Sequence, residues 1–347
     1  MDKIDIKSLD LNEMKKLIAS MSEKAFRAKQ LYEWLHVKLV DSFDEMTNLP
    51  LQLREQLAEV SEITNLEVVD KLESKTGETS KFLFRLYDGR VLESVLMKYH
   101  HGNSVCISSQ VGCKMGCKFC ASTIGGFERN LKPSEMLDQI YKIQKLSGER
   151  VSNVVVMGTG EPLDNYNNLI QFIRLLTDEN GLNISQRNLT VSTCGLVDKI
   201  KALAEEQLQI TLALSLHAPN DQVRKQLMPV AESYPLDDIL ESCDYYFKRT
   251  GRRITFEYSM VDGVNDLPEH AVELAHKIKN FPCHVNLIPV NPIKERNYMQ
   301  SGSKNILNFK NLLEKYRINV TIRREMGTDI DAACGQLRKS YMDQTSN

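Results

Sequence analysis

The sequence has no apolar run close to the roughly 20 residues that a membrane-spanning helix needs. Its first residues, MDKIDIKSLDLNEMKKL, are charged throughout and lack the apolar centre of a secretory signal. We therefore expect a cytoplasmic protein with no membrane partner.

The sequence also lacks an excess of charge of one sign. It has 44 Lys and Arg against 46 Asp and Glu, a formal net charge of −2. Proteins that bind nucleic acid usually have a basic footprint, so composition alone does not indicate such a partner. The basic residues fall instead into small groups, each most simply explained as solvated surface: Lys15/Lys16, Arg27/Lys29, Arg252/Arg253, Arg323/Arg324 and Arg338/Lys339.

Cysteine, in contrast, is well represented, with eight residues. Cytosolic thiols are kept reduced, so an even count does not by itself indicate disulfides. Cys113, Cys117 and Cys120 form a C-x3-C-x2-C pattern in GCKMGCKFCAS. Three cysteines so close together, separated by Lys, Met, Gly, Lys and Phe, cannot all face one core. This pattern predicts a metal site.

The number of thiols restricts the metal. Structural zinc nearly always has four ligands, often in paired CxxC motifs, and no second pair occurs here. Cys106 or a distant His could still complete a zinc site. A [4Fe-4S] cluster also normally takes four thiolates. With three, one iron lacks a protein ligand and can bind the amino and carboxylate groups of S-adenosylmethionine (SAM). The three-thiol pattern favours this second arrangement.

Short β-branched runs alternate with amphipathic segments over the last two thirds of the chain. The predicted strands are 105–110, 152–158, 188–195, 209–217, 253–261, 284–290 and 319–325. The predicted helices are one after Pro133 with Ser134 as its N-cap, and 166–178, 198–206, 236–249, 267–279 and 304–316. The alternation predicts an α/β fold of parallel βα units, an incomplete (β/α)6-type TIM barrel with its functional residues at the carboxyl ends of strands.

The N-terminal part has a different pattern. Segments 26–38 and 50–60 are predicted helices, and 66–74, 79–89 and 90–100 are predicted antiparallel strands with turn signals between them. We expect a small α+β accessory domain over 1–92, the partial barrel over 93–326, and a C-terminal extension over 327–347 that ends in a frayed tail.

The motifs resemble those of radical SAM enzymes, because Phe119 stands beside the last cysteine and GTGEP follows the next strand at 158–162. More of the chain resembles the RlmN/Cfr family of radical SAM RNA adenine methyltransferases, which methylate adenine at C2 (RlmN) or C8 (Cfr). Pro162 after Glu161 and the loop ASTIGGFERNL resemble the RlmN branch. The segments that carry the resemblance are ESVLMKY, CISSQVGCKMGCKFCASTIGGFERNL, GTGEPLDNY, STCG, SLHAPND, VNLIPVNP and DIDAACGQL.

The resemblance implies a mechanism for an electron-poor carbon that cannot attack SAM as a nucleophile. The Cys334 thiolate takes a methyl group from one SAM and becomes S-methylcysteine. A second SAM, cleaved reductively at the cluster, gives a radical that abstracts hydrogen from this methyl group, so two SAM molecules are used per turnover. The carbon radical adds to adenine C2, and Cys106 resolves the adduct through a transient disulfide with Cys334. Glu93 matches the proton acceptor.

The resemblance also implies the binding residues and partners. Cys113, Cys117 and Cys120 are the expected cluster ligands, and the expected SAM contacts are Gly160, Glu161, Ser192, Ser215, Leu216, His217 and Asn291. The expected partners are 23S rRNA, tRNA next to the anticodon, a reducing system of the flavodoxin or ferredoxin type and a thiol reductant. The N-terminal domain is expected to dock RNA.

Two other functions remain open from the sequence. A Cfr-type enzyme on the same scaffold would methylate C8 of adenine in 23S rRNA and give antibiotic resistance. A non-catalytic, zinc-bound RNA-binding protein would use the cysteines structurally. The mass of the methylated nucleoside distinguishes the first alternative, and metal analysis distinguishes the second.

Overall fold

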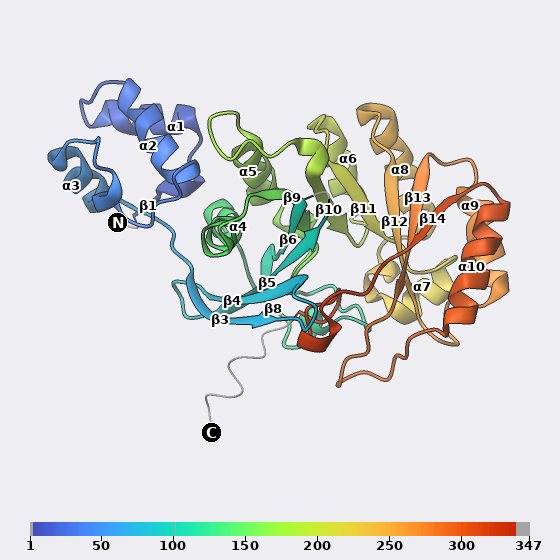
Figure 1. The fold of residues 1–347 in the computed structure, drawn as a ribbon. Coiled ribbons are helices and arrows are strands. Elements are labelled where there is room, and N and C mark those ends of the chain that lie inside the picture. Colours follow the sequence, from blue (N-terminus) through green and yellow to red (C-terminus); the bar gives the residue numbers. More distant parts are fainter. Residues whose placement is uncertain (1–2, 101, 338–347) are drawn as a thin grey trace.

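The computed structural model describes residues 3–100 and 102–337 (Figure 1). The expected frayed tail and the Arg338/Lys339 pair lie outside these residues. Within the described part of the chain, no helix is both long and apolar enough to cross a membrane.

The main body is one ten-stranded sheet, in the order β14-β13-β12-β11-β10-β9-β6-β5-β4-β3. From β6 to β14, neighbouring strands pair in parallel. The sheet is curved but open, with β14 at one edge and β3 at the other (Figure 1). The α/β fold with an incomplete barrel is therefore confirmed. The parallel strands are β6 (Gly102–Ile107), β9 (Val151–Val156), β10 (Leu189–Thr193), β11 (Thr211–Ser215), β12 (Ile254–Met260), β13 (Cys283–Pro289) and β14 (Asn319–Ile322).

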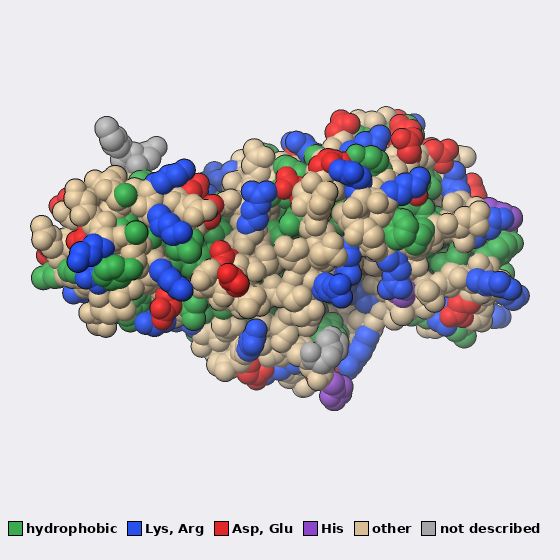
Figure 2. All heavy atoms as spheres, turned by 90° about the horizontal axis from the view of Figure 1, so that it is seen from above, with side chains coloured by type: hydrophobic (Ala, Val, Ile, Leu, Met, Phe, Trp, Pro, Cys, Tyr) green, Lys and Arg blue, Asp and Glu red, His purple; other side chains and the backbone are tan. Residues whose placement is uncertain are grey.

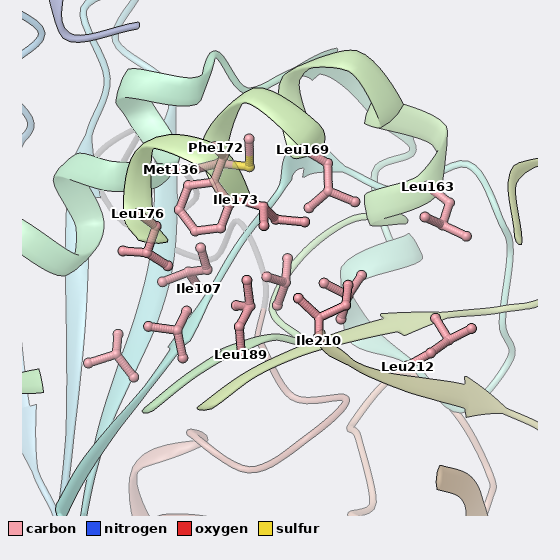
Figure 3. Close-up of a cluster of buried hydrophobic side chains, with 14 of the residues drawn as sticks. Ile107, Met136, Leu163, Leu169, Phe172, Ile173, Leu176, Leu189, Ile210 and Leu212 are labelled. Carbon is pink, nitrogen blue, oxygen red and sulfur yellow. The ribbon is translucent and has the colours of Figure 1, made fainter. Parts of the chain in front are cut away.

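Helices connect these strands and lie mainly along one face of the sheet (Figure 1). They are α4 (Pro133–Ser147), α5 (Tyr166–Thr177), α6 (Val197–Glu205), α7 (Asp221–Leu227), α8 (Leu236–Thr250), α9 (Pro268–Ile278) and α10 (Ser303–Lys315). Figure 3 shows apolar side chains of α4 and α5, among them Met136, Phe172 and Ile173, packed onto strand residues such as Ile107 and Leu189. The sequence predicts all these helices except the short α7.

The start of α4 differs from its prediction. Ser134 lies inside the first turn, Pro133 occupies the first helical position and Lys132 is the N-cap. The fixed φ of proline suits the first helical position, where its missing N–H is not needed. The Glu135 carboxylate accepts a hydrogen bond from Lys132 N at 2.8 Å, which completes the cap.

The N-terminal helices form a separate group beside α4 (Figure 1). They are α1 (Leu11–Ser20), α2 (Phe26–His36) and α3 (Leu51–Val60), with the short strands β1 (Ile4–Asp5) and β2 (Ser61–Glu62) pairing in parallel. A buried ion pair links this group to the body, since Lys7 Nζ lies 2.6 Å from Asp138 Oδ1 of α4. Lys7 Nζ also donates to Thr64 O, and Leu66 N donates to Asp138 Oδ2.

The three predicted antiparallel strands are β3 (Glu67–Glu73), β4 (Thr79–Arg85) and β5 (Val91–Tyr99). They join the main sheet, because β5 pairs with β6 in antiparallel register. The domain boundary expected between residues 92 and 93 lies inside β5. The helical group and these strands are thus attached to the body in different ways.

Candidate active site

Two cavities meet at the carboxyl ends of the parallel strands. The larger, of about 950 Å³ and called here the cysteine-loop cavity, is lined by the loops after β9 to β13 and by Cys113, Cys117 and Cys120. The smaller, of about 570 Å³ and called here the Cys106 cavity, lies between β5, β6 and the C-terminal loop. Five of the described residues line both cavities: Met157, Ile288, Asn291, Arg323 and Cys334.

The cysteine loop is held by a hairpin of β7 (Gln110–Gly112) and β8 (Phe127–Asn130). Gly112 has φ +72°, and a Cβ there would lie 1.9 Å from Gly126 O, so the turn requires glycine. Cys113 N donates to the same carbonyl at 3.1 Å. The hairpin therefore fixes where the three cysteines enter the cavity.

Burial controls the chemistry of these thiols. It raises the pKa of Cys113 to about 12, raises the pKa of Cys117 well above its ordinary value, and raises the pKa of Cys120. These three thiols, of which Cys113 is buried and Cys117 and Cys120 are partly buried, become thiolates readily only when bound to metal. Among the described residues, no three His, Cys, Asp or Glu side chains are spaced to hold a single metal ion. The donor set fits a [4Fe-4S] cluster, in which each thiolate binds a different iron.

The loop after β9 places Gly160 and Glu161 on the cavity wall. Gly160 has φ +110°, and a Cβ there would lie 2.6 Å from Gln110 Cβ. Glu161 is buried, and its carboxylate accepts hydrogen bonds from Leu163 N at 3.0 Å and Cys194 N at 2.8 Å. Burial raises the pKa of Glu161, although these hydrogen bonds act to lower it. This carboxyl ties the β9 loop to the β10 loop.

Ser192 at the end of β10 and Ser215 at the end of β11 line the cavity, with their Oγ atoms 3.4 Å apart. His217 also lines it and has a left-handed φ of +58°, unusual for a residue with a Cβ. Its Nδ1 accepts a hydrogen bond from Ser259 N at 2.9 Å, and burial lowers the pKa of its ring to about 3. The imidazole is therefore neutral near pH 7.

Leu216 is the exception among the expected SAM contacts. Its side chain is fully buried in the hydrophobic core and does not line the cavity. Its N–H donates to Glu257 O at 3.0 Å. Side chains alternate along an extended segment, so Leu216 points away from Ser215, which lines the cavity.

The C-terminal loop closes the site by binding the cysteine loop. Ala121 N donates to Gly335 O at 2.7 Å, and Ser122 Oγ donates to Leu337 O at 2.8 Å. On the other side, Asn291 Nδ2 donates to Cys334 O at 3.1 Å. Cys334 is thereby held at the junction of the two cavities.

Cys106, in β6, lines the smaller cavity together with Cys334. It is buried in a small apolar cluster with Val95, Met97 and Ala332. Burial raises the pKa of Cys106 to about 12, so it is a protonated thiol near pH 7. Both Cys106 and Cys334 are free thiols in the structure, which therefore gives no support to a disulfide at rest.

Glu93 does not line either cavity. It is buried on β5, where Lys81 Nζ lies 3.3 Å from its Oε1. Since side chains alternate along a strand, Glu93 shares a face with Val95 and Met97, which line the Cys106 cavity. The structure thus places Glu93 beside the Cys106 cavity, not in its wall.

Two charged residues of the site were not predicted from the sequence. Arg323, treated there as one of several surface pairs, lines both cavities, and the neighbouring Cys334 thiol is the main factor that raises its pKa. Glu257 in β12 lines the larger cavity and accepts a hydrogen bond from Asn286 Nδ2 at 2.9 Å. A charged residue in the middle of the apolar strand RITFEYSMV was the available signal for Glu257.

Comparisons with known proteins agree with this geometry. Residues 4–63 match the family described as the ribosomal RNA large subunit methyltransferase N-terminal domain, and residues 107–277 match the radical SAM superfamily. A protein of Lachnoclostridium phytofermentans named "Probable dual-specificity RNA methyltransferase RlmN" is 66% identical over 99% of this chain and 97% of its own length. A protein of the same name from Clostridium tetani is 53% identical over 99% of this chain and 98% of its own length.

The chain belongs to the RlmN family. A crystal structure of a radical SAM methyltransferase from Sphaerobacter thermophilus is similar over its whole length, with a TM-score of 0.93 and 41% identity, covering 97% of this chain and 100% of that one. These matches confirm the resemblance to the RlmN/Cfr family that the motifs indicated, including the assignment to the RlmN branch. They also confirm the radical SAM fold. Membership of the radical SAM superfamily implies a [4Fe-4S] cluster and SAM as cofactors of this RlmN family enzyme.

Proposed function

We propose that this protein methylates C2 of adenine in 23S rRNA, at the peptidyl-transferase centre, and in tRNA next to the anticodon. The observation that carries the proposal is the position of Cys334, at the junction of a cavity lined by three cysteines and a cavity lined by Cys106. A methyl carrier must be reachable from the SAM side and from the RNA side. The names of the relatives support RNA as the substrate.

The cofactors are assigned to the cysteine-loop cavity. Cys113, Cys117 and Cys120 hold the cluster, and SAM contacts Gly160, Glu161, Ser192, Ser215, His217, Asn291 and the backbone at Leu216. When bound, this pair supplies a carbon-centred radical by one-electron cleavage of the sulfonium, chemistry that belongs to the cofactor. The protein contributes orientation and a site screened from water.

Cys334 acts twice in the proposed reaction. Its thiolate attacks the methyl carbon of the first SAM, forming a new S–CH3 bond on Cys334 and displacing S-adenosylhomocysteine. Arg323 lines both cavities together with Cys334. After the methyl group has lost a hydrogen atom to the second SAM-derived radical, its carbon bonds to adenine C2, so the RNA is tethered to Cys334. Two SAM molecules are thus used per turnover.

Cys106 and Glu93 complete the cycle. Glu93 accepts the proton lost at C2, and the adduct gives up one electron, which the oxidised cluster would take up, as the ring regains aromaticity. Attack by the Cys106 sulfur on the Cys334 sulfur then forms the transient disulfide and breaks the bond to the methylene carbon. That carbon takes up a proton and becomes the methyl group. A thiol reductant restores both cysteines, and a flavodoxin- or ferredoxin-type protein supplies the electron that starts each cycle.

The RNA must present an unstacked base to reach these cavities. We assign docking to the N-terminal helices and to the dispersed basic groups, through phosphate contacts and shape. The match of residues 4–63 to a ribosomal RNA methyltransferase domain supports this role. Figure 2 shows Lys and Arg side chains in small groups over one face, including the end formed by these helices, at left. Such a substrate is found in the cytoplasm.

Product analysis tests the proposal. The full chain, purified without oxygen and with its cluster reconstituted, is incubated with SAM, a reductant and either 23S rRNA fragments or tRNA. Mass spectrometry of the digested RNA should show 2-methyladenosine, together with free 5′-deoxyadenosine. 8-Methyladenosine would instead assign the protein to C8 chemistry, and zinc without iron or sulfide would support a non-catalytic RNA-binding protein.

A further inference from the structure

Arg224 of α7 is a fully buried cation whose hydrogen bonds are incomplete. Its Nη2 donates to Cys194 O at 2.6 Å and Ser215 O at 3.4 Å, and its Nε donates to Leu216 O at 3.3 Å. All these acceptors are neutral backbone carbonyls, and Nη1 has no hydrogen-bond partner among the described residues. A guanidinium stays charged at neutral pH, so a positive charge is buried here without an ion pair to a described carboxylate.

This charge lies under the cysteine loop. Lys118 N, between two of the cluster cysteines, donates to Leu227 O at the end of α7 with a distance of 2.9 Å. A Cβ at Gly116 would lie 3.3 Å from Pro229 Cγ, so the loop and the segment after α7 are in close contact. Burial raises the pKa of the Cys117 thiol, and the positive charge of Arg224 acts in the opposite direction. Arg224 is therefore close enough to act on this cysteine.

The same guanidinium fixes the strand ends assigned to SAM. Its acceptors are Cys194 O just after β10, Ser215 O at the end of β11, and Leu216 O, which precedes His217. Arg224 therefore connects the cluster loop with the SAM side of the cavity. No feature of the sequence singles it out, because its surroundings are assembled from three separate segments.

We propose that Arg224 is a positioning residue that supplies the countercharge of the [4Fe-4S] cluster; this inference rests on the proposed function, which places the cluster on Cys113, Cys117 and Cys120. Three thiolates outweigh the positive charge of the oxidised cluster core, and the one-electron reduction that starts the reaction makes the site more negative. Net charge and nearby charges set the potential of such clusters. A fixed cation stabilises the reduced form most, so Arg224 makes the cluster easier to reduce.

The experiment is a redox titration of the cluster-loaded full chain without SAM, followed by electron paramagnetic resonance. Arg224→Gln removes the charge, and Arg224→Lys keeps it. The matched control is Arg252→Gln, since Arg252 is partly buried and also donates to a strand carbonyl, Ile210 O, at the opposite end of β11. Arg224→Gln should lower the ratio of reduced to oxidised cluster about tenfold at a fixed applied potential, a shift of about 59 mV to more negative values for one electron.

The two other variants should differ from Arg224→Gln. Arg224→Lys and Arg252→Gln should titrate close to the wild type. A potential that is unchanged in Arg224→Gln would overturn the inference, and so would equal shifts in Arg224→Gln and Arg224→Lys, because a charge effect requires them to differ.

A second measurement covers variants that load the cluster poorly. Without the cluster, the buried cation has no counterion. Arg224→Met and Arg224→Lys both disturb the guanidinium's hydrogen bonds to Cys194 O and Leu216 O, but only Arg224→Lys keeps the charge, so cluster-free Arg224→Met should melt at or above the temperature of cluster-free Arg224→Lys. If cluster-free Arg224→Met melts far below Arg224→Lys, the backbone carbonyls alone accommodate the charge and the inference is wrong.

Failure of the inference is separable from failure of the proposed function. Iron and sulfide analysis of the wild type comes first, and zinc in their place would refute the assigned cluster. Iron and sulfide in the wild type, with a potential that does not respond to Arg224→Gln, would leave the function standing and remove only the role of Arg224.

Discussion

Lys7 and Arg224 are both buried cations, but their surroundings differ. Lys7 joins the N-terminal helices to the body and forms an ion pair with Asp138 at 2.6 Å, and both side chains are only 1% exposed. Arg224 lies beside the strand-end site. Within residues 3–100 and 102–337 it donates only to backbone carbonyls, and its Nη1 has no partner there. The first region contains its own counterion. The region of Arg224 gains a counterion only when a negatively charged group occupies the cavity, and we assign that role to the cluster.

The largest expected effect is in the site region. Cys334→Ala should reduce RNA methylation by on the order of a thousandfold or more, because residues that form covalent intermediates have no substitute. Iron content and the free energy of unfolding should stay near wild-type values, since Cys334 is assigned no cluster bond. Cys283→Ala is the control, because that buried cysteine begins β13 at the end away from the cavities. Methylation retained by Cys334→Ala would refute the methyl-carrier role.

Cys106→Ala should also stop turnover, but by trapping the reaction at a later stage. Without the second thiol, the bond between Cys334 and the RNA-bound carbon has no route to break. Denaturing gels with labelled RNA should show a covalent protein–RNA species, absent in the double variant Cys106→Ala/Cys334→Ala. Free turnover by the single variant, with no such species, would show that Cys106 does not resolve the adduct.

In the N-terminal region, the expected effect is on stability and not on chemistry. Lys7→Met leaves Asp138 buried without its partner, which should lower the free energy of unfolding by about 3–5 kcal/mol. Lys98→Met, which breaks the exposed pair with Glu149 at 2.9 Å, should cost at most about 1 kcal/mol. Chemical denaturation measures both. Equal small losses would show that the buried pair does not anchor the helices, and would remove the contrast with Arg224.

A smaller effect is expected from pH, and here the two regions should behave alike. Burial lowers the pKa of His36, in α2, and of His217, at the site, to about 3. The unfolded chain takes up a proton near the ordinary histidine value of about 6.5, before the folded chain does, so stability falls as the pH is lowered from there towards 3. Each histidine should account for about 2 kcal/mol lost between pH 6.5 and 5.

Denaturation at a series of pH values measures this dependence. His36→Gln should flatten the profile by about that amount, whereas His100→Gln, at an exposed position, should leave it unchanged. A His36→Gln profile as steep as that of the wild type would show that His36 is not a neutral, buried group.

The sequence predicted the parts of the molecule that depend on local pattern. The parallel strands and most helices follow from periodicity, and the cysteine loop and Glu161 follow from motifs. The helix α1 was missed because its segment is strongly charged, although Asp10 and Glu13 form a capping box that could have marked it. The family resemblance assigned Leu216 to the site, but its side chain, just after β11, lies in the core.

The rest of the site depends on contacts between distant segments. Cys334 lies near Cys106 and the cysteine loop because Gly335 and Leu337 accept hydrogen bonds from Ala121 and Ser122. No spacing in the sequence encodes that arrangement. The environments of Arg323 and Arg224 are likewise tertiary, and each arginine has the appearance of an ordinary surface residue in the sequence.

The vacant coordination position on the cluster can be tested directly by electron paramagnetic resonance. The reduced, cluster-loaded protein is recorded alone and after SAM is added, with Cys334→Ala as a background in which methyl transfer cannot occur. If three cysteines hold the cluster and one iron is free, SAM should bind that iron and shift the g values of the signal. A signal that is unchanged by saturating SAM would mean that the cluster has a fourth protein ligand, which would contradict the proposed site.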